Sequence, residues 1–233
     1  MKMHHISLNR SKRYNVESLN SNIILILQGK ISIYINNKVV TLERKGGVFE
    51  ESAEAFYFPK AEKLSVLSNS ENSEFVLISS NHKGIEKDFK VHNDDIVTEK
   101  RGKETYCRTV KTIIGNKIQC GSLIVGETYH DSLLSGFPPH RHEKNIPSIE
   151  TSNKEKYLIK ISPNNGCGLF FNYDDSFSNS NINVLSNNDI ISVEKGYHSI
   201  MSMPNQKFYY LWALETIDNK FSSVSDTDFY YVS

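Results

Sequence analysis

The sequence predicts an all-β protein that is divided into two β-barrel halves. Short apolar runs and alternating apolar and polar residues dominate, and clusters of Asn, Ser, Gly and Asp separate them. Sustained helical periodicity is hard to find anywhere in the chain. Short strands at this spacing are typical of a barrel or a sandwich. With 233 residues, 38% of them hydrophobic, the chain has enough apolar material for one large domain or two small ones.

The first half is expected to begin with a buried strand at residues 23–27 and an alternating strand at 31–35. Gln28-Gly29-Lys30 is interpreted as the turn between them. Asn36-Asn37 is a tight-turn pair, so residues 39–42 are expected to return as the hairpin partner. Further strands are expected at residues 55–58, 63–67 and 75–79.

A polar stretch from residue 80 to 103 is interpreted as a surface linker. We therefore expect an N-terminal half at residues 1–95 and a C-terminal half at 96–233. The Asn- and Ser-rich residues 176–188 are expected to form a loop. Strands of the second half are expected at residues 105–114, 119–125, 129 onward, 156–161, 168–171, 190–193 and 208–214.

Charge and cysteine content exclude several classes of function. Lys+Arg and Asp+Glu both number 27, so nothing favours a nucleic-acid or anionic-membrane partner. No apolar run approaches the ~20 residues that cross a bilayer, and the start, Met1-Lys2-Met3-His4-His5, lacks the apolar stretch of a signal peptide. The three cysteines are scattered, which indicates a reducing compartment. We expect a cytoplasmic protein that handles a small metabolite.

Two histidines form the first part of a candidate metal site. In Pro138-Pro139-His140-Arg141-His142, the histidines are two residues apart, and such residues share one face of a strand. His140 and His142 can therefore converge on one ion, while Arg141 faces away and is expected to be structural. Imidazole nitrogen suits zinc, iron and nickel. An H-x-H pair alone is a weak signal, since most such pairs are incidental.

A third histidine follows a buried strand and a glycine turn, at Gly196-Tyr197-His198. This is the layout of a barrel strand that returns another ligand, although a structural histidine after a tight turn fits the same pattern. A carboxylate would complete a four-ligand site with open positions for substrate. The candidates for it are Glu143, Glu150 and Glu155.

Strand phase selects Glu155 as the carboxylate ligand. Glu143 directly follows His142, so on an extended chain it points to the opposite face. Glu150 lies in a stretch rich in turn formers, which is interpreted as a loop at the barrel rim. Glu155 opens the next strand, whose lysines fall on the other face and belong in solvent. Leu158, apolar on that outer face, is expected to be covered by a subunit contact, so a homo-oligomer is allowed.

Together these motifs resemble the cupin superfamily and, within it, the 5-deoxy-glucuronate isomerase family of myo-inositol catabolism, which is related to the 5-keto-4-deoxyuronate isomerases. The stretches that carry the resemblance are residues 25–35, 47–59, 122–129, 136–143, 155–163, 196–198, 208–211 and 221–232. The resemblance implies a bicupin with jelly-roll halves and an isomerase that acts on a sugar acid. It also implies one divalent ion (Zn²⁺, Mn²⁺, Fe²⁺ or Ni²⁺) on His140, His142, Glu155 and His198.

An aldose–ketose isomerisation moves a proton between adjacent carbons through an enediol, so it needs an acid or base within hydrogen-bond reach. The four ligands already have a task and do not easily double as that group. The candidates outside them are Glu150, Tyr157, Lys160, Tyr210 and Glu215. Surface charge or barrel packing is the alternative interpretation of each.

Three departures from the family pattern bear on the substrate. Leu158-Ile159 replace two tyrosines, Phe170-Phe171 replace a Gln-Arg pair, and the chain is shorter than the family leads one to expect. A site built to hydrogen-bond a polar group discriminates strongly, so a different sugar acid is an alternative substrate. Two further alternatives are an Fe(II) oxygenase with the same ligands and a non-catalytic cupin that binds a sugar acid.

The remaining histidines are expected to be solvated or structural, and the first half to be metal-free. No H-x-H pair precedes residues 58–64, and no histidine lies where a return strand would supply one. The residues concerned are His4, His5, His82, His92 and His130.

Overall fold

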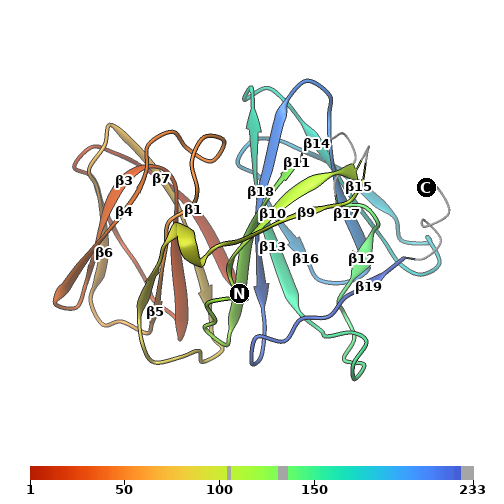
Figure 1. Cartoon of the computed structure of the whole chain (residues 1–233), viewed down its shortest axis with the longest axis horizontal. Coiled ribbons are helices and arrows are strands. Elements are labelled where there is room, and N and C mark those ends of the chain that lie inside the picture. Colours follow the sequence, from red (N-terminus) through yellow and green to blue (C-terminus); the bar gives the residue numbers. More distant parts are fainter. Residues whose placement is uncertain (104–105, 131–135, 227–233) are drawn as a thin grey trace. The chain divides into compact units, whose positions relative to one another are not determined.

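The structure, a computed structural model, describes residues 1–103, 106–130 and 136–226. Within these ranges the chain forms strands and short 3-10 turns such as η1 (Asn93–Asp95). Two compact units are present (Figure 1). The first comprises Met1–Val97, Thr112–Val125 and Ile217–Asn219, and the second comprises Thr98–Lys111, Gly126–Thr216 and Lys220–Ser233. No helix of the described residues is long and apolar enough to span a bilayer.

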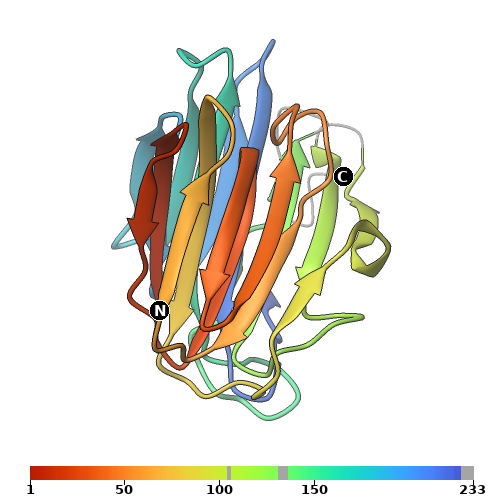
Figure 2. The ribbon, with the colours of Figure 1, turned by 90° about the vertical axis from the view of Figure 1, so that its left-hand side faces the viewer.

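The first unit is organised around one long central strand, β3 (Ser21–Ile35), whose apolar side chains are almost all buried. Figure 2 shows its strands side by side. One path of hydrogen-bonded strands runs β1-β7-β3-β5-β8, while β4 and β6 also pair with β3 and β2 pairs with β6. The other strands are β1 (Lys2–Asn9), β2 (Arg13–Asn15), β4 (Lys38–Arg44), β5 (Ala55–Pro59), β6 (Leu64–Ser68), β7 (Asn72–Ser80) and β8 (Phe89–Val91).

The turn predicted at residues 28–30 is wrong, because β3 continues through it. The register with β7 shifts between Ile26 and Gln28, which marks a β-bulge. Gly29 has φ +83°, and a Cβ there would lie 2.4 Å from the carbonyl oxygen of Asn72. Glycine therefore lets the strand bend without ending, so that it pairs with β5 and β7 before the bulge and with β4 and β6 after it.

Three segments for which no strand was predicted contain strands. The N-terminal residues form β1, which pairs with β7 along its whole length. The predicted linker contains β8 and β9 (Val97–Arg101), and the predicted loop contains β15 (Asn181–Leu185). These strands lie at or near sheet edges. Their conformation is determined by pairing with a strand distant in sequence, and their own hydrophobic pattern indicates it only weakly.

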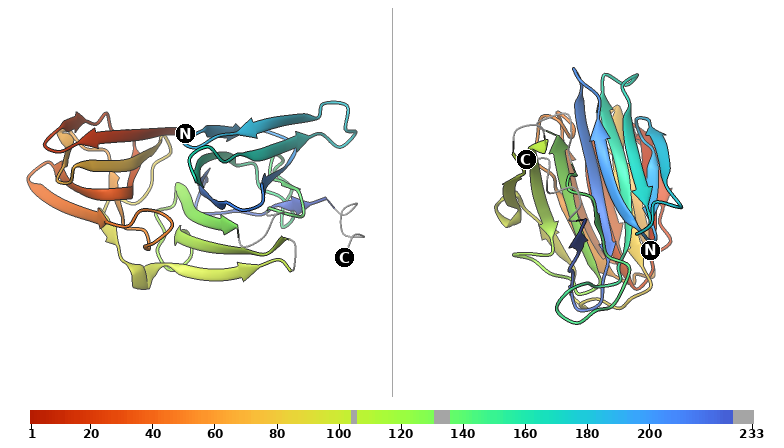
Figure 3. Two further views of the ribbon diagram at one scale, coloured as in Figure 1. Left: turned by 90° about the horizontal axis from the view of Figure 1, so that it is seen from above. Right: turned by 90° about the vertical axis from the view of Figure 1, so that its right-hand side faces the viewer.

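Two further sheets, shown from two sides in Figure 3, carry the candidate site. The six-stranded sheet has the order β16-β13-β18-β11-β10-β9, and the five-stranded sheet has the order β15-β14-β17-β12-β19. Their strands are β10 (Arg108–Ile114), β11 (Leu123–His130), β12 (His140–Arg141), β13 (Lys154–Ser162), β14 (Gly168–Tyr173), β16 (Ile190–Val193), β17 (Tyr197–Ser202), β18 (Lys207–Glu215) and β19 (Val224–Ser225).

Side chains from both sheets share one apolar core. From the six-stranded sheet it takes residues of β13, β16 and β18, and from the five-stranded sheet residues of β14, β15 and β17. The members are Tyr157, Ile159, Ile161, Phe170, Leu185, Val193, Ile200, Phe208 and Tyr210. The core fixes the two sheets against each other, and the candidate ligands project from both into the same space.

Candidate metal centre

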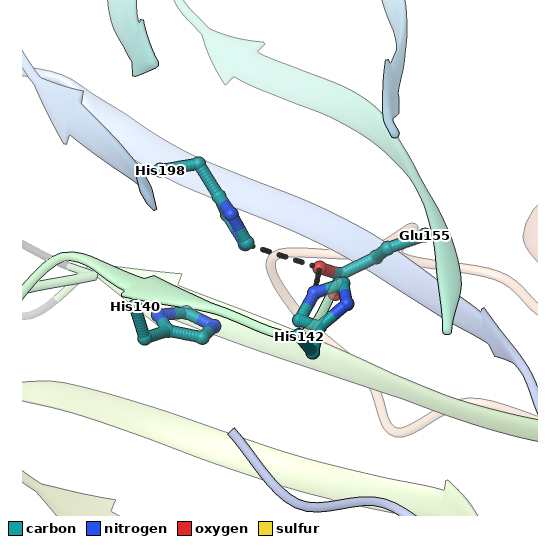
Figure 4. A group of neighbouring side chains, drawn as sticks. All are labelled: His140, His142, Glu155 and His198. Atoms are coloured by element: carbon teal, nitrogen blue, oxygen red, sulfur yellow. Dashed lines mark hydrogen bonds and ion pairs between the residues drawn. The ribbon is translucent and has the colours of Figure 1, made fainter. Parts of the chain in front are cut away.

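Strand pairing brings the predicted histidines and glutamate together. His140 on β12 is the direct cross-strand partner of His198 on β17. Glu155 lies on β13 of the other sheet, where it pairs with Val193 and Leu214. His142 follows β12 by one residue. Figure 4 shows the four side chains pointing toward one another from these elements.

The four side chains are close enough to share one ion. One ligand atom from each of His140, His142, Glu155 and His198 lies within 4.8 Å of all the others. Glu155 Oε2 is 3.0 Å from His142 Nε2 and 3.3 Å from His198 Nε2 (Figure 4). Three of the four residues are buried, and His140 is partly exposed. Among the described residues, this is the one such group of potential ligands.

The hydrogen bonds of two histidines fix which ring nitrogen faces the centre. The carbonyl oxygen of Asn153 lies 2.9 Å from His142 Nδ1, and that of Gly196 lies 3.2 Å from His198 Nδ1. A carbonyl only accepts, so each Nδ1 carries a proton and each ring directs its Nε2 toward Glu155. His198 Nε2 is buried and has no hydrogen-bond partner in the described part of the chain.

Imidazole nitrogens that converge on a carboxylate need a cation, either a proton or a metal ion, between them. A proton on His142 supplies one such cation: burial acts to lower its pKa, but the hydrogen bond and charge of Glu155 outweigh burial and raise it. A divalent ion satisfies all four groups at once, and three imidazoles with one carboxylate are a donor set that first-row metals accept. The residues therefore fit a divalent metal.

Glu155 and His140 are held in the charge states that a metal needs. Burial alone would raise the pKa of Glu155, but hydrogen bonds to His142 and His198 lower it well below its usual range. Burial, helped by the neighbouring His198, lowers the pKa of His140 to about 3. At neutral pH the carboxyl is ionised and this imidazole is neutral, and both are the ligand forms.

Tyr157 positions the carboxylate. Its hydroxyl donates a hydrogen bond to Glu155 Oε2 at 2.6 Å, and its ring is buried in the core. Burial and the negative charge of Glu155 raise the pKa of Tyr157 well above its usual value, so the phenol stays protonated. It therefore acts as a fixed donor to the ligand.

Removing this hydroxyl is expected to weaken metal binding. Tyr157→Phe keeps the ring in the core but removes one of the contacts that orient Glu155 Oε2, so the affinity for a divalent ion should fall roughly tenfold. Competition against a chromogenic chelator measures this. Tyr209→Phe is a matched control, because Tyr209 donates a similar buried bond, 2.8 Å long, to Glu127, which is not one of the four ligands. Equal losses in the two variants would contradict a positioning role for Tyr157.

The other two glutamates have partners outside the four-ligand group, and Glu143 points away from the imidazoles as the strand phase indicated. Glu143 Oε2 accepts a 2.7 Å hydrogen bond from the backbone of Gly196. Glu150 is 1% exposed, so its interpretation as a surface charge is wrong. It accepts backbone hydrogen bonds from Glu143 and Lys144 and pairs with Arg141 at 3.4 Å. These partners explain why a charged side chain is tolerated there, and Arg141 indeed faces away from the centre.

The acid or base candidates divide into two groups. Tyr157 and Tyr210 line a cavity that also includes His140 and Glu155. Glu150, Lys160 and Glu215 do not line it, and Lys160 Nζ donates to Asn188 Oδ1 at 2.7 Å instead. Sequence reasoning missed other residues of the cavity wall, namely Arg101, Arg108, Val110, Thr128, Gly136, Trp212, Leu214 and Phe221.

The departures from the family pattern lie outside this cavity wall. Leu158 and Ile159 are fully buried, so the expected subunit contact over Leu158 is not needed to cover it. Phe170 packs in the core, with its ring centre 6.4 Å from that of His198. The aliphatic and aromatic replacements therefore alter the packing behind the ligands.

The remaining histidines are outside the four-ligand group. His5 lies on β1 and pairs with Glu74 at 3.1 Å. His130 packs against Phe208 and Tyr210, and both its ring nitrogens lack a hydrogen-bond partner among the described residues. Burial lowers the pKa of His130 to about 3, so the ring is neutral.

Comparison with known proteins identifies relatives of the whole chain. The family model described as the KduI/IolB family matches residues 1–231. A 5-deoxy-glucuronate isomerase of Geobacillus kaustophilus (strain HTA426) is 27% identical over 192 residues, which cover 81% of this chain and 69% of the relative. Two further 5-deoxy-glucuronate isomerases, of Lacticaseibacillus casei and Shouchella clausii (strain KSM-K16), match over 42% and 70% of their own length.

Solved structures share the fold. An IolB-like protein from Salmonella typhimurium LT2 superposes with a TM-score of 0.87 at 22% identity, over 97% of this chain and 87% of that one. The oxalate decarboxylase of Lactobacillus farciminis, in complex with formate, gives a TM-score of 0.66 at 9% identity, over 98% of this chain and 80% of that one. The likeness confirms the predicted all-β bicupin fold.

Proposed function

The chain belongs to the KduI/IolB family, and from that membership and its four converging ligands we propose that it is a metal-dependent aldose–ketose isomerase acting on 5-deoxy-glucuronate. At the coarser level it is an isomerase of sugar-acid catabolism, in line with the names of its relatives. The metal requirement, the substrate and the roles of individual residues are the proposal.

The observation that carries the metal requirement is the convergence of His142 Nε2 and His198 Nε2 on the ionised, buried carboxylate of Glu155. A protein that used this space only for packing would be expected to fill it with apolar side chains, because buried charge without a partner is costly. His140, His142, Glu155 and His198 would hold the ion. When bound, a divalent ion stabilises the negative charge that develops on the enediolate oxygens of the sugar.

The chain's own residues bind the rest of the substrate and control the proton. Tyr157 keeps its proton and fixes Glu155, so it is suited to hold a ligand and poorly suited to be the base. Tyr210, which lines the same cavity, is the remaining acid or base candidate of the five. The apolar wall of Val110, Trp212 and Leu214 limits water around the reacting carbons.

An anaerobic assay tests the reaction class. The metal-loaded protein should convert 5-deoxy-glucuronate into its ketose isomer without oxygen or nicotinamide, because isomerisation needs neither oxidant nor reductant. In deuterium oxide, proton NMR should show the signals of the ketose appearing. The same spectra report whether deuterium replaces hydrogen at the two carbons between which the proton moves. A strict need for oxygen would support an Fe(II) oxygenase instead. Binding without turnover of any uronate would support a non-catalytic cupin.

A further inference from the structure

The cavity beside the four ligands has an arginine on its wall that no carboxylate neutralises within the described part of the chain. Arg108 opens β10, and its Nη1 donates one hydrogen bond, 3.1 Å long, to the carbonyl oxygen of Phe137. A guanidinium has five N–H donors, so with respect to the described residues most of its capacity is left for another acceptor. Glu155 is the one acidic residue among those that line the cavity, and its charge is directed at the histidines.

Strand phase directs Arg108 into the cavity. Residues two apart on a strand share a face, and both Arg108 and Val110 line the cavity. The neighbouring strands β11 and β18 contribute Thr128 and Trp212, which are joined by a 3.1 Å hydrogen bond from the indole nitrogen. The inner face of this sheet thus carries a cation at one end and the carboxylate ligand at the other.

The separation suits a molecule with two different ends. The sheet order β13-β18-β11-β10 places Arg108 three strands from Glu155, or roughly 14 Å along the sheet at the usual strand spacing. Both side chains reach inward and shorten this gap. An open-chain sugar acid has a carbonyl at one end and a carboxylate at the other, so it can contact both groups at once.

We propose that Arg108 binds the carboxylate of the sugar acid and so determines the preference for an acid over a neutral sugar. The inference rests on the proposed function, since it requires that the carbonyl end lie at the four-ligand centre. A guanidinium matches a carboxylate with two parallel hydrogen bonds, which adds both strength and orientation. Lys160 is outside the cavity wall and its Nζ donates a hydrogen bond to Asn188 Oδ1.

Arg101 is a weaker candidate for the same role. It also lines the cavity, but its side chain is 50% exposed and is already paired with Glu99. An ion pair at such a position is screened by water and contributes little. Arg108 is therefore the group whose charge is available to a ligand.

Calorimetric titration of the metal-loaded protein with D-glucuronate and D-glucuronamide tests the proposal, because the two probes differ only in the carboxylate. Arg108→Met should weaken binding of D-glucuronate about tenfold or more, while binding of the amide changes by about twofold or less. Lys111→Met is the matched control. It removes the same charge from the opposite face of β10, where the ammonium lies 4.9 Å from the ring centre of Tyr129.

Metal content, measured in parallel, should stay at the wild-type level in both variants. If Arg108→Met fails to fold, Arg108→Lys carries the test, since it keeps the charge but loses the paired hydrogen bonds and should reduce the acid-to-amide ratio. Equal losses for acid and amide, a Lys111→Met loss as large as that of Arg108→Met, or a wild type that binds both probes alike would overturn the inference. Arg108-dependent binding of the acid without turnover of 5-deoxy-glucuronate would leave it standing and remove the proposed substrate.

Discussion

Glu155→Gln is expected to lower the affinity of the protein for a divalent metal by about 10–100-fold or more. Losses of that size already follow from changing groups that only orient a ligand, and here the anionic ligand itself is removed. The amide keeps the shape of the side chain but lacks the negative charge that attracts the metal ion. Its NH₂ group can donate to the lone pair of His142 or His198, so the metal-free variant should remain folded. Metal analysis after dialysis, together with chelator competition, measures the effect.

Two other glutamates provide the controls for this substitution. Glu143→Gln keeps an oxygen that can accept from the backbone of Gly196, and it should retain wild-type metal content. Glu150→Gln should also keep its metal but unfold at a lower temperature. The buried carboxylate of Glu150 pairs with Arg141. Burial alone would raise the pKa of Glu150, but the backbone hydrogen bonds and the charge of Arg141 lower it, so these contacts stabilise the ionised form that the substitution removes. If the Glu150 variant lost its metal while the Glu155 variant kept it, the strand register would be wrong.

The four converging residues could be predicted from the sequence because their placement depends in part on local geometry. His140 and His142 share a face through the two-residue period of an extended chain, and the same period separates Glu155 from the lysines beside it. The step that local geometry does not supply is the pairing of His140 with His198, which comes from strands far apart in the chain. A resemblance to a known family supplied that step.

The cavity wall was missed because each of its strands contributes one or two residues. A signal for Arg108 was nevertheless present: Arg108, Val110, Thr112 and Ile114 alternate on one face of a strand, so a charged residue shares an otherwise inward-facing row. A cation in that phase needs an anionic partner inside the cavity. The strand phase alone does not identify that partner.

The misplaced edge strands have a different physical cause. In β15, Ile182 and Val184 are 66% and 67% exposed, and the strand pairs only with β14 among the described strands. Its backbone hydrogen bonds to β14 hold it in place, and burial contributes little. Hydrophobic patterns report burial, so they indicate such a strand weakly.

Removal of the metal is expected to abolish isomerase activity and to leave the β-rich fold intact. The fold has apolar cores, in each unit, that do not include the ligands His140, His142 or His198. In the metal-free centre, the raised pKa of His142 lets a proton take the place of the ion beside Glu155, so that the buried carboxylate keeps a cationic partner. A chelator should therefore eliminate turnover, while the far-ultraviolet circular dichroism spectrum stays close to that of the loaded protein.

The same proton makes metal binding depend on pH. An ion must displace the proton from His142, so affinity should fall as the pH drops below the raised pKa of that residue, by roughly tenfold per pH unit for each proton displaced. His140, with a pKa of about 3, adds no competition until far more acidic conditions. Zn²⁺, Mn²⁺, Fe²⁺ and Ni²⁺ are each added back separately at neutral pH, and the ion that the centre uses should restore activity. About one ion per chain should suffice, because one group of converging potential ligands is present in the described residues. Cooperative unfolding on chelation would instead show that the centre is structural, since a site whose ion holds the fold together cannot be emptied without losing it.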